Sequence, residues 1–119
     1  MLRARTVLPL LPLLVLGACA TQTPRSAPPV YLRMTEQDVE LANQALDRAL
    51  ETLPSGQAAT WRNAANGHSG SVRPLRTAFV AARSAYCRDY EEVLTIGGQT
   101  ERYRDTACRE PQGLWIPVE

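Results

Sequence analysis

A pair of consecutive glycines, Gly97-Gly98, most constrains how this chain folds. It separates two segments of strand-forming composition, residues 85–96 and 99–109, and such a loop suits the positive φ angles of a type I′ or II′ hairpin turn. Counting outwards from the turn places Cys87 directly opposite Cys108, as a non-hydrogen-bonded pair. Cα atoms of such pairs lie about 4.5 Å apart, which a disulfide can span. The sequence therefore predicts a β-hairpin closed by a disulfide.

The N-terminal segment has the three parts of a secretory signal. Two arginines precede a short apolar run, residues 7–16, and the small residues Gly17 and Ala18 follow it. A membrane-spanning helix needs about 20 apolar residues, whereas this run is shorter and contains prolines. We therefore expect residues 1–18 to be a signal peptide.

The four residues Leu16-Gly17-Ala18-Cys19 resemble the lipobox of bacterial lipoproteins. In lipoproteins the cysteine thiol receives a diacylglycerol, the leader is cleaved before the cysteine, and the new amino group is acylated. The resemblance implies lipidation at Cys19 and a stable membrane anchor, because two or more acyl chains hold a protein firmly. Ala20 follows in place of aspartate, which favours the outer membrane. The alternative is an ordinary signal peptide with a coincidental cysteine.

Lipidation of Cys19 also accounts for the odd number of cysteines. The remaining two, Cys87 and Cys108, would lie in an exported, oxidising compartment, where two thiols most often form one disulfide. Closing a loop of this size contributes about 3 kcal/mol in the chain-entropy model. That is a large share of the stability of a small domain.

The rest of the chain predicts one small α+β domain, residues 35–118. Residues 19–34 contain several prolines and few large apolar side chains, which is typical of a flexible tether. Thr35 is a good N-cap for an amphipathic helix that extends to Leu53. Short segments then predict an antiparallel meander of about five strands, at 58–64, 71–82, 85–96, 99–109 and 114–118. We expect the helix to pack on one face of this meander.

The hairpin register divides the side chains between the two faces of the sheet. One face takes the cysteines, with Glu91 opposite Arg104. The other face is more apolar and takes Tyr86, Tyr90, Leu94, Ile96, Tyr103 and Ala107. We expect the apolar face to form the core and the disulfide to lie on the wetter face.

Charge and motifs argue against several classes of function. Without the leader the side-chain charge is about −1, and no basic excess marks a nucleic-acid surface. His68 is the only histidine and lacks the partner spacing of a metal site, so we expect an ordinary loop residue. Glu91 and Glu92 point to opposite faces of a strand, which favours arginine-paired carboxylates over an acid–base pair. We expect no catalytic residues, cofactor or metal.

Four residues are candidates for binding. Arg88 and Arg109 each follow a cysteine, and Arg109 faces Tyr86 in the register, where stacking on the ring favours a structural role. The functional alternative is that these arginines bind a carboxylate or phosphate of peptidoglycan stem peptides or lipid headgroups. Trp61 and Trp115 would either form an exposed aromatic surface or supply bulk to a core with little phenylalanine.

Several short motifs in residues 57–118 occur together in one order and spacing. They are Trp61-Arg62-Asn63, Gly67 with Gly70, Val72 with Pro74, Cys87-Arg88 with Tyr90, Ile96 with Gly98, Ala107-Cys108-Arg109, and Gly113 with Trp115. This set resembles the C-terminal domain of the 17 kDa surface-antigen lipoproteins of Gram-negative bacteria. The resemblance implies an outer-membrane lipoprotein with a compact β-rich domain, and it defines no activity. Many members carry a glycine-rich segment where this chain has the predicted helix.

Together these features predict a non-enzymatic outer-membrane lipoprotein that acts as a structural or binding module of the envelope. Its expected partners are the membrane, through the anchor, and another envelope protein or peptidoglycan. One alternative is a periplasmic lysozyme-inhibitor-like lipoprotein, with the loop at His68-Ser69 entering a glycosidase cleft. The other is an accessory factor of outer-membrane β-barrel assembly.

Overall fold

The computed structural model describes residues 8–14, 17 and 27–118. Most of the expected signal peptide, the expected lipidation site Cys19 and the first half of the expected tether lie outside the described residues. Among the described residues, no helix is both long and apolar enough to cross a membrane.

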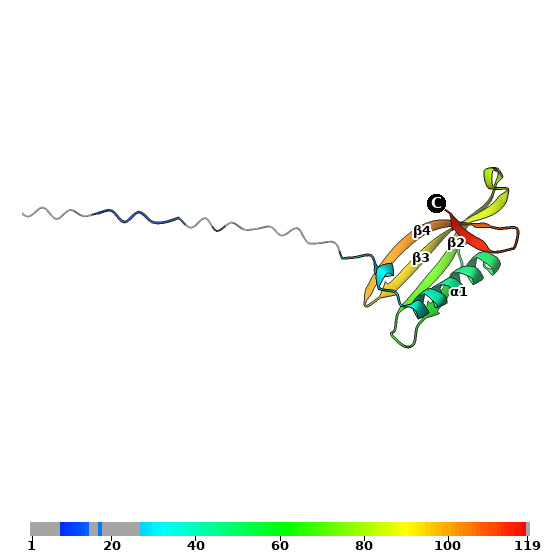
Figure 1. Cartoon of the computed structure of the whole chain (residues 1–119), viewed down its shortest axis with the longest axis horizontal. Coiled ribbons are helices and arrows are strands. Elements are labelled where there is room, and N and C mark those ends of the chain that lie inside the picture. The colour runs from blue at the N-terminus through cyan, green and yellow to red at the C-terminus, as the bar shows by residue number, and fades with distance from the viewer. Residues whose placement is uncertain (1–7, 15–16, 18–26, 119) are drawn as a thin grey trace, which may run out of the picture.

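The described chain folds as one helix and five strands, as the sequence predicts (Figure 1). The elements are η1 (Val30–Arg33), α1 (Glu36–Thr52), β1 (Ala59–Arg62), β2 (Ser69–Val80), η2 (Ala81–Arg83), β3 (Ala85–Ile96), β4 (Gln99–Arg109) and β5 (Trp115–Val118). All neighbouring strands are antiparallel, in the order β1-β2-β3-β4-β5. The fold is therefore an α+β meander.

The predicted hairpin is confirmed residue by residue. Ile96 pairs with Gln99, and the register continues to Cys87 opposite Cys108. Gly97 and Gly98 both have positive φ angles, 57° and 80°, which identifies the turn as type I′ rather than II′. The two cysteines form the predicted disulfide, with Cα atoms 4.0 Å apart. The disulfide lies on the face opposite the core, as expected, although both cysteines are themselves buried.

Helix α1 begins where its capping chemistry predicts. The backbone N–H of Asp38 donates to Thr35 Oγ1 at 3.1 Å, and the backbone N–H of Thr35 donates to Asp38 Oδ2 at 2.8 Å. This reciprocal pair is a capping box, which satisfies two backbone donors at the helix start. The face turned to the sheet carries Ala42, Ala45 and Ala49. Such small side chains allow the helix to lie close to the strands.

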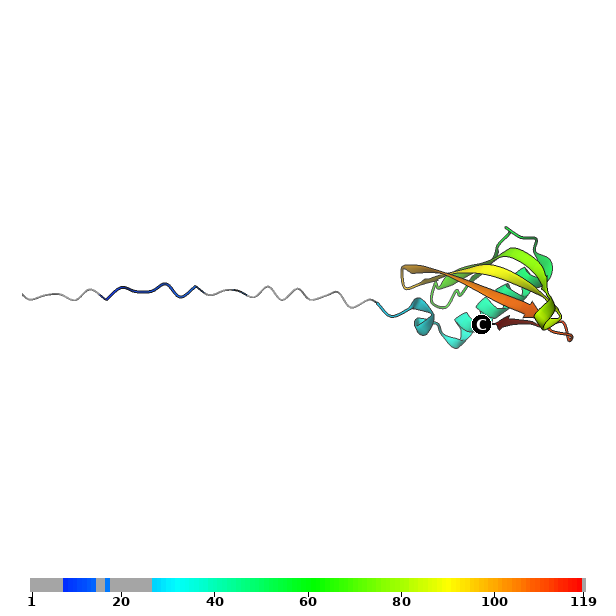
Figure 2. The ribbon, with the colours of Figure 1, turned by 90° about the horizontal axis from the view of Figure 1, so that it is seen from above.

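Helix α1 and the short η1 cover the same face of the sheet (Figure 2). α1 contacts β1 and β2, whereas η1 contacts β3 and β4. The core between them contains Tyr90, Leu94, Ile96 and Ala107, as predicted, and Tyr103 packs against its margin. Val30 of η1 is fully buried, so the folded domain begins before Thr35, within the segment expected to be tether.

One residue of the predicted core face lies outside the core. Tyr86 is 59% exposed and packs edge-to-face on Phe79, with ring centroids 5.3 Å apart. Arg88, the next residue inward on this face, already contacts the C-terminal end of α1. Tyr86 therefore lies beyond the end of the helix, where no second layer covers the sheet.

Candidate binding face

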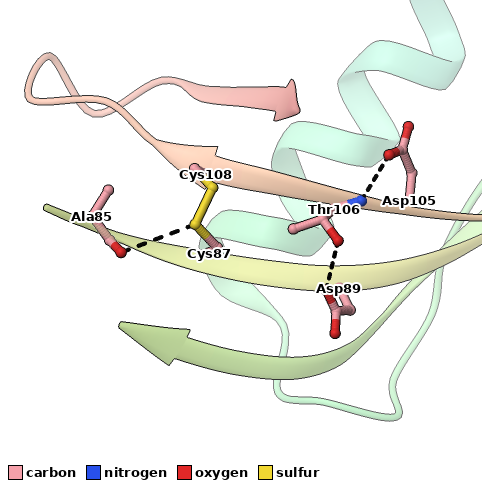
Figure 3. Close-up of a disulfide and its surroundings, with 6 residues drawn as sticks. All are labelled: Ala85, Cys87, Asp89, Asp105, Thr106 and Cys108. Atoms are coloured by element: carbon pink, nitrogen blue, oxygen red, sulfur yellow. Dashed lines mark hydrogen bonds between the residues drawn. A yellow bond between two sulfur atoms is a disulfide. The ribbon is translucent and has the colours of Figure 1, made fainter. Parts of the chain in front are cut away.

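Among the described residues, no second layer covers the face of the sheet turned away from α1, and we call it the open face. Strand alternation and the register place on it Arg73 and Arg76 from β2, Asp89 and Glu91 from β3, and Arg102 and Arg104 from β4. Figure 3 shows part of it, where Thr106 Oγ1 donates to Asp89 Oδ1 at 2.6 Å beside the disulfide. The register also places Arg62 of β1 on this face, so five arginines against two carboxylates make the open face cationic.

Glu91 organises the arginines of this face. Its Oε1 accepts hydrogen bonds from Arg73 Nη2 at 2.7 Å and from Arg102 Nη1 at 3.2 Å. The Glu91 side chain is 11% exposed, so this carboxylate is largely desolvated and shared by two guanidinium groups. Glu91 is therefore paired with arginine, as expected, whereas Glu92 forms no ion pair with another described residue.

Two of the remaining three arginines line one cavity and are available to a ligand. Arg76 and Arg104 make no ion pair with another described residue. Both line an open cavity of ≈ 620 Å³, whose other lining residues are Leu75, Asp89, Tyr90, Asp105, Thr106 and Val118. Guanidinium groups bind carboxylate and phosphate oxygens through paired hydrogen bonds. Arg76 and Arg104 are therefore the groups of this cavity that suit an anion, whereas its carboxylates are those of Asp89, which accepts from Thr106, and Asp105.

Arg88, a predicted binding residue, is on the covered face and is bound to the helix. Its Nη1 donates to the carbonyl oxygens of Ala49 at 3.2 Å and Leu50 at 2.6 Å, and its Nη2 donates to that of Leu53 at 2.9 Å. Its Nε donates to Thr77 Oγ1 at 2.9 Å. The last carbonyls of a helix lack intrahelical donors and carry partial negative charge. Arg88 thus caps the C-terminus of α1, although burial lowers the pKa of the guanidinium.

The Cys87-Arg88 pair of the sequence motif therefore serves two faces. Successive strand residues point to opposite sides of a sheet. Cys87 closes the disulfide on the open face, whereas Arg88 attaches α1 to the covered face. Two adjacent residues of β3 therefore attach this strand to β4, through the disulfide, and to α1, through Arg88.

Arg109 and Trp115 meet at a carboxylate of the helix. Arg109 Nη2 donates to Glu51 Oε1 at 3.1 Å, and Trp115 Nε1 donates to Glu51 Oε2 at 2.8 Å. The predicted stacking of Arg109 on Tyr86 is replaced by this ion pair, because β4 and β5 bring the guanidinium to the end of α1. The pair is half exposed and is accessible to solvent.

Trp61 belongs to the core, in line with the structural alternative. It is 6% exposed and lies against Gly70 of the neighbouring strand. A Cβ atom at Gly70 would lie 2.5 Å from Trp61 Nε1, so the indole requires glycine there. The four predicted binding residues thus do not form one site.

A network around Asp38 has no counterpart in the sequence predictions. The side chain of Asp38 is fully buried, and its Oδ1 accepts from Asn63 Nδ2 at 2.8 Å and Asn66 Nδ2 at 3.1 Å. Its Oδ2 lies 2.7 Å from His68 Nδ1 and also accepts the Thr35 N–H. Burial raises the pKa of Asp38, but the hydrogen bonds from His68, Thr35, Asn63 and Asn66 outweigh it and lower the pKa well below its ordinary value.

His68 therefore has a structural partner that its sequence context does not reveal. Asp38 is 30 residues earlier in the chain, so no local spacing links the two. Asn66-Gly67 predicts a turn, but the carboxylate that holds this turn, Asp38, belongs to helix α1. Among the described residues, no group of three or more histidine, cysteine, aspartate or glutamate side chains is placed to bind a metal.

The sequence of this domain is similar to that of a known protein family. Residues 48–116 match the family described as 17 kDa outer membrane surface antigen. The chain belongs to this family. The matched span includes the end of α1, strands β1–β4 and the start of β5, and therefore the disulfide and the Arg88 cap. Asp38 lies before it.

Relatives with this description come from Rickettsia. The 17 kDa surface antigen of Rickettsia felis is 44% identical over 85 residues, which is 71% of this chain and 53% of the relative. That of Rickettsia bellii is 43% identical over the same shares. The chain thus spans about half the length of these curated relatives. No solved structure matches.

Proposed function

We propose that this surface-antigen family member is an outer-membrane lipoprotein, anchored through acylated Cys19, whose domain is a non-enzymatic binding module for an anionic envelope component. The observation that carries the binding role is the cationic open face, where Arg76 and Arg104 line one cavity without ion-pair partners among the described residues. The component would present phosphate or carboxylate groups, as lipid headgroups and peptidoglycan stem peptides do.

Two independent features support the anchor. The lipobox-like Leu16-Gly17-Ala18-Cys19 follows a leader of the right composition, and the family description names the outer membrane. Curated relatives are named surface antigens, which is consistent with a role other than catalysis. A lipid anchor would confine the domain to the membrane surface and so raise its effective concentration near envelope ligands.

Charge reversal tests the binding role. The protein carrying Arg76→Glu and Arg104→Glu should lose at least about tenfold of its affinity for its anionic ligand, because two charge-assisted contacts become repulsive. Sedimentation with anionic vesicles, zwitterionic vesicles and purified peptidoglycan sacculi identifies which component binds. Arg48→Glu with Arg83→Glu, at exposed arginines of α1 and η2, controls for the same change in net charge. Equal binding by the double variant and this control would exclude the open face.

Labelling tests the anchor. Cells supplied with radiolabelled palmitate should label the wild-type protein and should not label Cys19→Ala, which would stay unprocessed or soluble. Membrane fractionation then locates the labelled protein. Unchanged labelling of the variant would contradict lipidation at this cysteine.

A further inference from the structure

The outer edge of β4 has no partner strand over most of its length in the described part of the chain. β5 pairs only with Thr106–Arg109, and β4 continues beyond it towards the hairpin (Figure 1). We call the remaining stretch, Thr100–Asp105, the β4 edge. The outermost strand of a sheet presents backbone N–H and C=O groups that can hydrogen-bond another chain. The β4 edge is therefore a candidate site for an added strand.

The hairpin register specifies which backbone groups of this edge point outwards. Gln99 pairs with Ile96 beside the type I′ turn, and such a flanking pair is hydrogen-bonded. Because hydrogen-bonded and non-hydrogen-bonded pairs alternate, Thr100, Arg102 and Arg104 direct their N–H and C=O groups away from β3. All three residues are exposed. The β4 edge thus offers a donor and an acceptor at every second residue, which is the pattern that an antiparallel strand requires.

The other outer strands of the sheet carry devices that hinder edge pairing. On β1, the carbonyl oxygen of Thr60 accepts from Arg48 Nη2 at 3.1 Å. On β2, the stretch beyond β1 contains Pro74 and an irregular register, and the Pro74 carbonyl oxygen accepts the Gly56 N–H at 2.8 Å. On β5, Pro117 has no N–H to donate. The β4 edge contains no proline, glycine or bulge, so its sequence leaves it able to pair.

The charges beside these backbone groups select the partner. The side chains of Thr100, Arg102 and Arg104 lie on the open face. Arg102 shares Glu91 with a second arginine, whereas Arg104 forms no ion pair with another described residue. Carboxylates opposite these arginines form favourable cross-strand pairs. A second copy of β4 instead brings two more arginines to the same face, and like charges across neighbouring strands are destabilising.

The covered side of the β4 edge calls for apolar side chains. Tyr31 of η1 is 52% exposed and packs edge-to-face on Tyr103 of β4, with ring centroids 5.8 Å apart. Glu101 and Asp105 lie on the same side as Tyr103, and their charges disfavour further carboxylates there. A strand added to this edge therefore alternates acidic residues, on the open face, with apolar residues that cover the two rings.

We propose that an extended acidic segment of a partner protein adds to the sheet along the β4 edge, antiparallel to β4 and in line with β5. Its backbone bonds Thr100, Arg102 and Arg104, its carboxylates face the two arginines, and its apolar residues lie against Tyr31 and Tyr103. Recognition of this kind takes its affinity from main-chain hydrogen bonds and its specificity from alternate side chains. The inference goes beyond the proposed function, because backbone groups carry it. The two share Arg104, so their tests must separate them.

Designed peptides added to the full-length protein in detergent micelles test the backbone pairing. The probe is a blocked peptide that alternates glutamate and valine, with a dissociation constant on the order of 0.1 mM. In the antiparallel register its glutamate N–H groups point to β4 and its valine N–H groups point away. Amide hydrogen exchange should slow at Thr100, Arg102 and Arg104 when the peptide binds.

Methylated and charge-reversed peptides are the controls. N-methylation of the glutamates should weaken binding at least about tenfold, whereas N-methylation of the valines should change it less than about twofold. Lysine in place of glutamate should weaken it at least about tenfold. Equal affinity of the two methylated peptides would overturn the proposal. So would slowing of exchange at the same amides with rising protein concentration and no peptide, because a second copy would then occupy the edge.

A matched pair of variants separates the β4 edge from the cavity of the open face. Thr100→Pro removes an outward N–H without a change in charge, and Thr100→Ala keeps that N–H, while both lose the hydrogen bond to Thr95 Oγ1. The proline variant should bind the peptide at least about fivefold more weakly than the alanine variant. Thr100 does not line the cavity, so both should bind anionic vesicles or sacculi like the wild type. Equal peptide binding by the two variants would refute strand addition and leave the charge-reversal test of Arg76 and Arg104 unaffected.

Discussion

The β3–β4 hairpin and the β1–β2 connection solve the same problem, reversing the chain between antiparallel strands, by opposite means. The hairpin turns in two residues, Gly97 and Gly98, whose positive φ angles fit a type I′ turn and its register, and Arg33 of η1 adds a hydrogen bond to the Ile96 carbonyl oxygen. The longer β1–β2 connection is held by Asp38, a buried carboxylate of the distant helix. The conformation of the short turn is therefore set mainly by its own residues, whereas that of the longer connection depends on tertiary contacts.

The two asparagines of the β1–β2 connection show how this dependence works. Asn63 Oδ1 accepts the backbone N–H of Ala65 at 3.0 Å, and Asn66 Oδ1 accepts that of His68 at 2.9 Å. Each side chain thus shapes the loop with its oxygen and holds Asp38 with its nitrogen. Loss of the carboxylate leaves both amides without their buried acceptor.

Removal of that carboxylate is the most severe test of the comparison. Asp38→Ala should lower the free energy of unfolding by about 4 kcal/mol, because it leaves buried donors without a partner. Urea denaturation measures the loss, with Asp47→Ala, an exposed carboxylate of the same helix, as the control. A loss equal to the control would show that the connection, like the hairpin, holds its own shape.

Removal of the disulfide tests how much the cross-link contributes to the stability of the hairpin. Replacing Cys87 and Cys108 together by alanine should lower the free energy of unfolding by about 3 kcal/mol, since the unfolded chain gains loop entropy. Reduction of the wild-type protein should cost a similar amount. Non-reducing peptide mapping should first show the two cysteines joined, and free thiols at both positions would refute the pairing.

The third test concerns the attachment of the hairpin to the helix. Arg88→Met keeps the apolar stem but removes the hydrogen bonds to Ala49, Leu50 and Leu53, and should cost about 2 kcal/mol. Amide hydrogen exchange should accelerate in the last turn of α1. Arg76→Met, at an exposed arginine of β2, is the matched control and should change neither quantity measurably.

Acid should weaken the β1–β2 connection before it affects the hairpin. The pKa of Asp38 is lower in the folded protein than its ordinary value, so the ionised carboxylate stabilises the fold above about pH 4 and this contribution is lost as the pH falls. Between pH 7 and pH 3 the loss from this group should be about 1 kcal/mol. Urea denaturation at both pH values should show this loss of unfolding free energy in the wild type and not in Asp38→Asn. An identical pH dependence of the two proteins would contradict the role of the Asp38 carboxylate.

Features that depend on residues close in sequence could be predicted, and features that depend on long-range packing could not. The bounds of β3 and β4, the Cys87–Cys108 pairing and the start of α1 are correct, because each depends on residues close in sequence or on a ladder that propagates from one turn. The exposure of Tyr86 and the Glu51 partner of Arg109 were missed, since both depend on where the helix ends over the sheet.

The candidate sites show the same division. The cationic open face follows from the hairpin register and from strand alternation, both of which the sequence predicts. The sequence motifs, however, indicate Arg88 and Arg109 as binding residues in place of Arg76 and Arg104. The cover that η1 provides over β3 and β4 could not be predicted, because residues 30–33 lie in a segment whose composition is typical of a tether. No periodicity in that short segment indicates that Val30 is buried.

The sequence by itself determined the α+β class, the meander, the hairpin register and its disulfide, because alternation and turn geometry act between neighbours. Only the tertiary structure decided that Arg88 caps α1, that Asp38 orders a loop with His68, and which face of the sheet stays open. The physical reason is that buried polar groups take their partners from whichever element packs over them. Packing brings together residues that share no local pattern.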